Sequence, residues 1–265
     1  MRTFKFKLYN HKRNRKLKRK INISGMIWNH CIALHRRYYR LYGKSLNVNA
    51  LMKHLTKLKK LAKYAYWREL DAQAVQDVAQ RIDKAYKKFF EDHKKGKKTG
   101  IPKFKKVKNY SSFTLKQTGY KIITGNEIII MGQKYKYFKS REIEGIVKTI
   151  QVKRDSLGDM YIFITCETND NIVIPRTGNS VGFDFGLKMF LTGSDGTEVL
   201  SPEWFKKALA DIRKASRKLS SKKKGSNNRY KANKHLARVH KRIANQRHDF
   251  HFKLAGYLSG KYATI

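Results

Sequence analysis

The chain has 265 residues, enough to bury a sizeable core and to form two domains. Its 61 Lys and Arg residues outnumber 19 Asp and Glu residues, and the net charge of +42 predicts a polyanionic partner because such self-repulsion destabilises a bare compact fold. The 15 Tyr, 14 Phe and 3 Trp residues exclude a disordered tail, and without an amphipathic anchor or a long apolar run the expected partner is nucleic acid and not a membrane.

The first hundred residues combine one strand with three helices. Apolar and lysine side chains alternate over residues 3–9, which predicts a strand. After a basic turn, apolar residues recur every three or four positions over residues 23–41, which is typical of an amphipathic helix. Two further amphipathic helices are expected over about 49–63 and 70–93, before the glycines and proline of KKGKKTGIP end the helical region.

Between residues 104 and 174 the pattern changes to short alternating segments separated by turn signals, which predict a small barrel or sandwich. Because residues 3–9 also form a strand, we expect the three helices to be an insertion into that β-domain. The segment PRTGNS at 175–180 is expected to link it to a second domain.

The second domain begins at Val181. VGFDF predicts a strand, GSDG at 193–196 a hairpin turn, and TEVL the returning strand. Two helices are expected over about 203–219 and 229–258, joined by the flexible basic loop SSKKKGSNN. The closing residues KYATI have the character of the opening of another strand.

Asp184 in VGFDFG is the main candidate for chemistry. Asp-Phe-Gly is the magnesium-binding triplet of protein kinases, but no glycine-rich loop, strand lysine or H-R-D motif precedes it, so a kinase is not expected. A two-metal nuclease also uses a strand aspartate, with magnesium ions held between carboxylates and the scissile phosphate, yet it needs at least two further carboxylates. A single strand aspartate is more often a turn or capping residue.

Alternation along this strand places Val181, Phe183 and Phe185 on one face and Asp184 on the other. Gly186, which has no side chain, would let a nucleic-acid backbone approach closely.

Other metal sites are not indicated. Cys31 and Cys166 have no C-x-x-C partner, which excludes a cysteine-built zinc ribbon within these residues and indicates a reducing cytoplasm. No histidine pair has H-E-x-x-H spacing, so histidines are expected on helix surfaces or in RNA contacts. A basic stripe at helical spacing is the best candidate for binding an RNA backbone, and it consists of Lys234, Arg238 and Arg242.

The stretch VGFDFGLKMFLTGSDGTEV, residues 181–199, resembles the first RuvC motif of the transposon-encoded TnpB proteins, the OrfB family of insertion sequences. These proteins are RNA-guided relatives ancestral to type V CRISPR effectors. Residues 206–258 resemble the basic helical hairpin of the family, and GIPKFKK, AYKKFF and MIWNHCIALHRRYY resemble further family signatures. The resemblance covers essentially the whole chain.

The resemblance implies an α+β, multidomain architecture. Residues 1–20 and 100–178 would form the wedge, an oligonucleotide-binding-type β-barrel, and residues 21–99 an inserted helical recognition lobe. Residues 181–265 would form the amino-terminal part of a RuvC domain, which is ribonuclease-H-like and carries the basic helical hairpin.

The resemblance also implies a function: DNA targeting by a transposon-derived guide RNA, dependent on a short transposon-adjacent motif in double-stranded DNA, in a prokaryotic cytoplasm. Cleavage would need Mg²⁺, with Asp184 as the first catalytic carboxylate and metal ligand. Amide and hydroxyl side chains that could read adenine edges of the motif are Gln73, Gln76, Gln117 and Thr118. Phosphate-binding candidates besides the stripe are Lys103 and Lys105.

The sequence departs from the family at the metal site. A second catalytic glutamate, a zinc ribbon and a third aspartate should follow KYATI, and Asp195 and Glu198 match no catalytic position. Asp184 alone should therefore not cleave DNA. The chain is either the first part of a longer nuclease, which the retained Asp184 and Gly186 favour, or a cleavage-dead RNA-guided repressor. A plain RNA-binding or ribosome-associated protein would explain the charge but not the RuvC-like strand.

Overall fold

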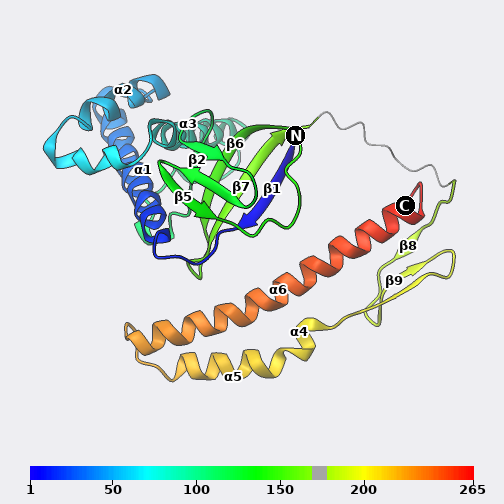
Figure 1. Ribbon diagram of the computed structural model, residues 1–265. Coiled ribbons are helices and arrows are strands. Elements are labelled where there is room, and N and C mark those ends of the chain that lie inside the picture. Colours follow the sequence, from blue (N-terminus) through cyan, green and yellow to red (C-terminus); the bar gives the residue numbers. More distant parts are fainter. Residues whose placement is uncertain (169–177) are drawn as a thin grey trace. The chain divides into compact units, whose positions relative to one another are not determined.

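The computed structural model describes residues 1–168 and 178–265, and the chain forms two compact units, Met1–Asn169 and Asp170–Ile265 (Figure 1). The expectation of a mixed α and β chain is confirmed, and the paired strands of its three sheets are antiparallel. Residues 175–177 of the predicted linker at 175–180 lie outside the described residues.

A four-stranded sheet unites the two ends of the first unit. Its order is β1-β7-β6-β2, and its strands are β1 (Arg2–Lys7), β2 (Ser112–Leu115), β6 (Ile146–Arg154) and β7 (Met160–Glu167). Phe4 pairs with Ile164 and Phe6 with Ile162, and all four side chains are buried. The helices between β1 and β2 are thus an insertion into this β-region, as predicted.

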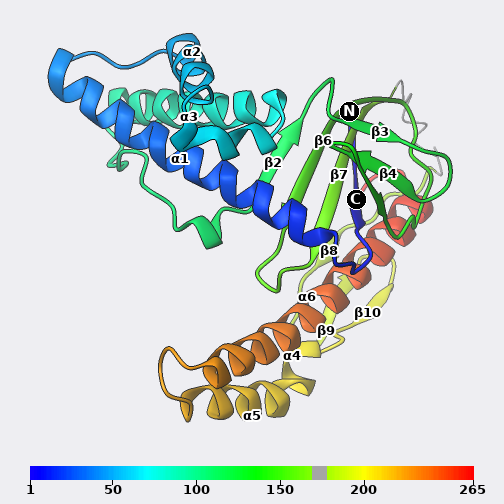
Figure 2. The ribbon, with the colours of Figure 1, turned by 60° about the vertical axis from the view of Figure 1, so that its left-hand side comes forward.

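A three-stranded sheet of order β3-β4-β5 lies beside it in the first unit (Figure 2). Its strands are β3 (Tyr120–Ile122), β4 (Glu127–Ile130) and β5 (Gln133–Lys136). An isolated bridge from Leu8 to Tyr137 connects the two sheets, and the Tyr137 ring lies 5.2 Å from that of Phe6. This contact extends one core across both sheets.

The inserted helices differ from the prediction at their ends. They are α1 (Asn14–Tyr42), α2 (Val48–Leu58), the 3₁₀ helix η1 (Ala62–Glu69) and α3 (Ala72–Lys94). The basic turn expected before residue 23 is wrong: these residues continue α1 because Leu17 and Ile21 are fully buried on its inner face. α2 ends five residues early, and η1 follows it with Trp67 buried.

The second unit holds a small sheet and a long helical hairpin (Figure 1). The sheet has the order β10-β9-β8, with β8 (Phe183–Asp184), β9 (Met189–Gly193) and β10 (Glu198–Leu200). The helices are α4 (Trp204–Lys207), α5 (Leu209–Ser220) and α6 (Asn227–Lys261). The single helix expected over 203–219 is therefore interrupted, at Ala208.

The carboxyl-terminal residues return to the start of this sheet. Thr264 forms a parallel bridge with Ser180, and the Val181 amide donates to the Thr264 carbonyl at 3.1 Å. KYATI thus begins strand pairing, as expected. No helix within 1–168 or 178–265 combines the length and the apolar character needed to cross a bilayer.

Candidate nucleic-acid interface and catalytic carboxylate

Asp184 ends β8 with its side chain exposed. Val181 is buried, and the Phe183 ring packs edge-on against Tyr262 with 5.9 Å between centroids. The predicted alternation therefore holds from Val181 to Asp184. It fails at Phe185, which is 73% exposed because the strand has ended one residue before it.

The surroundings of Asp184 offer little to a metal ion. Among the residues that the structure describes, no group of three or more His, Cys, Asp and Glu side chains could hold one. Gly186 has a packing reason of its own: a Cβ there would lie 2.9 Å from the Met189 carbonyl oxygen. The tight turn between β8 and β9 requires glycine whether or not a nucleic acid approaches it.

Asp195 has a structural position at the β9–β10 turn. It accepts hydrogen bonds from the Tyr262 hydroxyl, from the Thr197 amide at 3.0 Å and from the Lys261 ammonium at 3.4 Å. These bonds, that of Tyr262 above all, lower the pKa of the Asp195 carboxyl. Asp195 thus ties the turn to the end of α6, a contact that the sequence did not reveal.

The segments predicted to read the DNA motif lie against each other because a partly buried ion pair fastens α3 to β2. Asp77 accepts from the Thr114 amide at 2.9 Å and pairs with Arg81 at 2.8 Å. Arg81 donates to the Ser112 carbonyl at 3.0 Å and to the Thr114 hydroxyl at 2.9 Å. β2 is an edge strand of its sheet, so the clamp covers an edge that would otherwise be open.

This clamp sets the first turns of α3 beside the turn that follows β2. Lys116 donates to the Gln80 side chain, and a Cβ at Gly119 would lie 3.2 Å from the Asp71 carboxylate. Three of the four predicted motif-binding side chains are exposed, and only the first is half-buried: Gln73, Gln76, Gln117 and Thr118. Their role in reading bases stays a prediction.

The GIPKFKK segment lies along α1 as an extended strap, defined here as residues 100–106. Its backbone is held by side chains of α1: Trp28 donates to the Lys103 carbonyl at 3.2 Å and Arg36 to the Pro102 carbonyl at 3.3 Å. Asn29 both accepts from the Lys105 amide and donates to its carbonyl, at 2.8 Å each. The strap therefore has a fixed course, and its backbone contacts were missed at the sequence level.

The two lysines of the strap are placed differently. The Lys105 ammonium lies 3.9 Å from the centre of the Trp28 ring, and its pKa is lowered by desolvation and then by the Arg81 charge. Lys103 is exposed, beside Phe104, whose ring is 51% exposed and 4.7 Å from the Arg36 guanidinium. Both lysines are exposed and so accessible to a phosphate, and the Lys105 ammonium is in addition placed over the Trp28 ring.

The predicted basic stripe runs along α6. Arg238 and Arg242 are exposed, and the half-buried Lys234 holds its ammonium 4.7 Å from the Tyr230 ring centre. Ile243 is buried, so the helix has an inner apolar side and an outer basic side as predicted.

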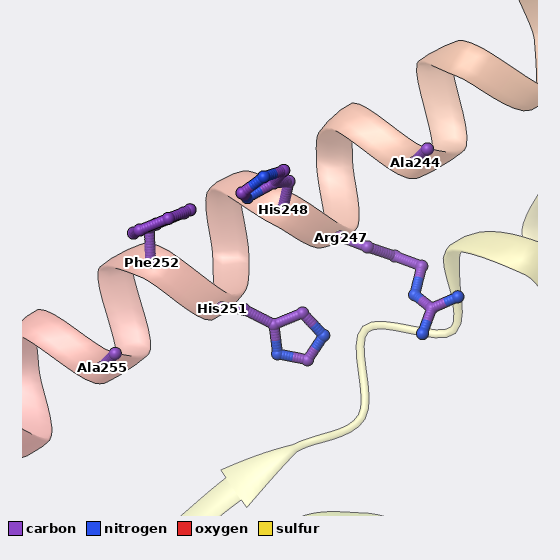
Figure 3. A pocket seen from close by; sticks show the side chains of 6 residues that line it. All are labelled: Ala244, Arg247, His248, His251, Phe252 and Ala255. Atoms are coloured by element: carbon purple, nitrogen blue, oxygen red, sulfur yellow. The ribbon is translucent and has the colours of Figure 1, made fainter. Parts of the chain in front are cut away.

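Further along α6, beyond this stripe, lies an aromatic and cationic surface (Figure 3). The His248 and Phe252 rings stack at 4.7 Å, and Phe252 is 68% exposed. Arg247 and His251 extend from the same helix, and with Ala244 and Ala255 these side chains line a shallow groove. Exposed rings beside cations are suited to stacking with nucleobases.

A histidine pair in the helical insertion was not anticipated. Nε2 of His30 on α1 lies 3.1 Å from Nε2 of His54 on α2, and the rings stack at 5.3 Å. Tyr64 and Trp67 contact His30 edge-on. Burial lowers the pKa of both histidines. The pKa of His30 is lowered further by the neighbouring His54, and the pKa of His54 by the charge of Lys57.

Comparison with known proteins finds one family model and two curated relatives that resemble this chain. Residues 163–265 match the OrfB_IS605 family, described as a probable transposase. The chain is 28% identical over 241 residues to the putative RNA-guided DNA endonuclease InsQ of Escherichia coli (strain K12), covering 90% of this chain. It is also 28% identical over 273 residues to a putative RNA-guided DNA endonuclease of Streptomyces pristinaespiralis, covering 100% of this chain. The resemblance inferred from the sequence is thus confirmed.

The chain spans 58% and 65% of the length of these two relatives. Among solved structures, a cryo-EM structure of a CRISPR-Cas12f ternary complex matches 91% of this chain and 58% of its own. Its sequence identity is 14% and its TM-score is 0.38, a likeness too weak to define the fold.

Proposed function

We propose that this chain acts in RNA-guided, motif-dependent targeting of double-stranded DNA, in the manner of TnpB, and that cleavage depends on Mg²⁺ at a RuvC site to which Asp184 contributes. The observation that carries the proposal is the exposed Asp184 at the end of β8, inside the region that matches the OrfB_IS605 family. Two relatives that align with 90% and 100% of the chain are named RNA-guided DNA endonucleases. The protein would act in a prokaryotic cytoplasm, on the nucleoid when bound to DNA.

The two units would divide this task. In the first, the two sheets bridged at Leu8 and Tyr137 would form the wedge, an oligonucleotide-binding-type barrel, and the inserted helices the recognition lobe. In the second, β8, β9 and β10 with the parallel bridge between Ser180 and Thr264 would begin the RuvC domain. Antiparallel strands together with a parallel bridge from the returning carboxyl-terminal residues support a ribonuclease-H-like beginning.

Magnesium would be bound through oxygen ligands, and it stabilises the attacking and leaving oxygens during phosphodiester cleavage. Asp184 offers one such carboxylate, which does not by itself fit a two-metal site. The role assigned to this chain's residues is therefore to present one ligand on a strand end that is open to the substrate.

Binding would rest on the surfaces described above. Gln76, Gln117 and Thr118 are exposed where α3 and the turn after β2 meet, and amide side chains can pair with adenine edges. The basic outer side of α6 and Lys103 of the strap would contact phosphates of the guide RNA.

The test begins with the protein expressed from its native locus and the RNA that copurifies with it. One abundant RNA with a constant scaffold and a variable segment matching DNA beside the element supports guided targeting. A heterogeneous RNA mixture that dissociates on raising the salt concentration would overturn it.

The second step measures cleavage of motif-bearing DNA by the full-length protein with its RNA and Mg²⁺. Asp184→Asn should abolish cleavage while leaving DNA binding intact, because the substitution removes the charge and keeps the shape. Glu198→Gln is the control, since Glu198 is an exposed carboxylate on β10 of the same sheet. Cleavage that survives Asp184→Asn would exclude the catalytic assignment.

A further inference from the structure

The tip of the α5–α6 hairpin has a defined structure, although its sequence predicted a flexible loop. The Arg229 guanidinium donates to the Leu219 carbonyl at 3.0 Å and to the Lys222 carbonyl at 2.8 Å, which ties the end of α5 to the start of α6. Ser226 caps α6 by accepting from the Arg229 amide at 3.1 Å, and Gly225 adopts φ of +86°. The Arg229 guanidinium thus forms its hydrogen bonds within the hairpin.

A half-open cleft lies between the two helices just beside this tie. Its floor includes Ala232, whose side chain is small and buried, so the cleft has room for a ligand. Its walls carry three lysines, an amide and an imidazole, contributed by α5, the loop and α6: Lys218, Lys222, Asn228, Lys231 and His235. No carboxylate is among the lining residues.

This lining selects an anion. Three ammonium groups around one concave space repel one another, and a ligand with several negatively charged oxygens relieves that repulsion. The cleft is distinct from the predicted stripe, because Lys234 holds its ammonium over Tyr230 and is not among the lining residues.

Asn228 and His235 make the ligand more specific. Lysines only donate hydrogen bonds, whereas an amide and an imidazole can both donate and accept. A ribose 2′-hydroxyl is likewise both donor and acceptor, and it lies next to the backbone phosphates in RNA and is missing from DNA. A cleft in which lysines can donate to phosphates, beside an amide and an imidazole that can bond a 2′-hydroxyl, therefore matches an RNA strand better than a DNA strand.

We propose that the cleft formed by Lys218, Lys222, Asn228, Lys231 and His235 binds the sugar–phosphate backbone of RNA. The inference rests on the proposed function, which it deepens by assigning a particular site for the guide RNA to the tip of the hairpin.

The first test compares two triple variants of the full chain that lose the same charge. The cleft variant is Lys218→Gln, Lys222→Gln and Lys231→Gln; the control is Lys214→Gln, Lys223→Gln and Lys224→Gln, exposed lysines of the same hairpin outside the cleft. The probes are a fluorescent RNA stem-loop and a DNA stem-loop of matching sequence, titrated at several salt concentrations. We expect the cleft variant to lose about ten-fold in RNA affinity near physiological salt, with a shallower salt dependence, and the control to lose less than about three-fold.

Equal losses of RNA affinity in the two variants would overturn the assignment of RNA binding to the cleft, because binding would then depend on total charge alone. A loss for DNA as large as for RNA would overturn the assignment to RNA. Circular dichroism and thermal unfolding check that both variants keep the native fold.

The second test addresses the sugar. Asn228→Ala with His235→Ala leaves all three lysines in place and should weaken RNA binding several-fold while DNA binding stays the same. An unchanged ratio of RNA to DNA affinity would contradict the role of these side chains. If the cleft variants bind RNA normally but a guide RNA copurifies with the wild type, the cleft proposal is wrong and the proposed function stands. If a random RNA population copurifies with the wild type, the proposed function is wrong, whatever the cleft binds.

Discussion

The two units of this chain are stabilised in different ways. In the first, large side chains such as Phe6, Trp67 and Tyr137 are fully buried in one continuous core. In the second, among the described residues, the main core cluster has four buried side chains, Val181, Leu191, Leu258 and Tyr262, while Leu187 is 99% exposed. The first unit should therefore depend mainly on its core, and the second more on hydrogen bonds and on its ligand, since a ligand that binds only the folded state stabilises that state.

The largest effect is expected from a cavity in the first core. Ile162→Ala should lower the free energy of unfolding of that unit by about 4 kcal/mol, because Ile162 is fully buried between paired strands. Leu191→Ala should cost the second unit about 2 kcal/mol, since its smaller cluster can relax around the change. Amide hydrogen exchange resolves the two units, and equal losses would erase the distinction drawn above.

A second difference is the buried charge in the first unit. Asp77→Ala should destabilise it by about 3 kcal/mol, because Arg81 would keep its charge without its carboxylate partner at the α3–β2 contact. Denaturant unfolding followed by fluorescence in a Trp204→Phe background reports on Trp28 and Trp67, which lie in the first unit. The control is Asp83→Ala on the same helix, whose pairing with the exposed Lys87 is worth less than about 1 kcal/mol.

The second unit should respond to a single hydroxyl. Tyr262→Phe removes the hydrogen bonds to Asp195 and Thr197 and should cost about 1 kcal/mol of stability, with faster exchange of the β9 and β10 amides. The pKa of Asp195, which the Tyr262 hydroxyl lowers, should rise, and carbon-detected NMR can follow it. An unchanged titration of Asp195 would show that this bond is unimportant.

The smallest expected effect is a pH dependence confined to the first unit. Burial lowers the pKa of His30, His35 and His54, so the unfolded chain binds protons before the folded unit does. Stability should therefore be constant above the ordinary histidine pKa and fall as the pH drops below it. The urea midpoint of the first unit is measured between pH 7.5 and 5 in the wild type and two variants. Its change with pH should be smaller in His54→Gln than in the wild type and unaltered in His248→Gln, a control on α6. The same change with pH in all three proteins would contradict the interpretation.

Much of the secondary structure could be predicted because it is encoded locally. The alternation of apolar and lysine residues predicted β1, and apolar residues spaced three or four apart predicted the centres of α1, α3 and α6. The start of α1 was missed because seven Lys and Arg residues surround Leu17 within residues 12–20 and mask the apolar period. The break at Ala208 has no local signal of this kind.

The site was less predictable, because its contacts join residues far apart in the sequence. Asp184 could be named from its motif, and its exposure follows from strand alternation. The pairs Lys105–Trp28, His30–His54 and Asp195–Tyr262 depend on tertiary packing, and no periodicity reveals them. The cleft at the hairpin tip likewise needs the relative placement of α5 and α6.

The pairing of β1 with β7 has a consequence for synthesis on the ribosome. Arg2 lies opposite Cys166, so the first strand made must wait for nearly the whole first unit to emerge before it finds its partner. The helical insertion, whose contacts are more local, can form during that wait. Until β7 arrives, β1 is an unpaired strand, and Lys5 and Lys7, which alternate with its phenylalanines, disfavour pairing of the nascent chain with neighbouring chains.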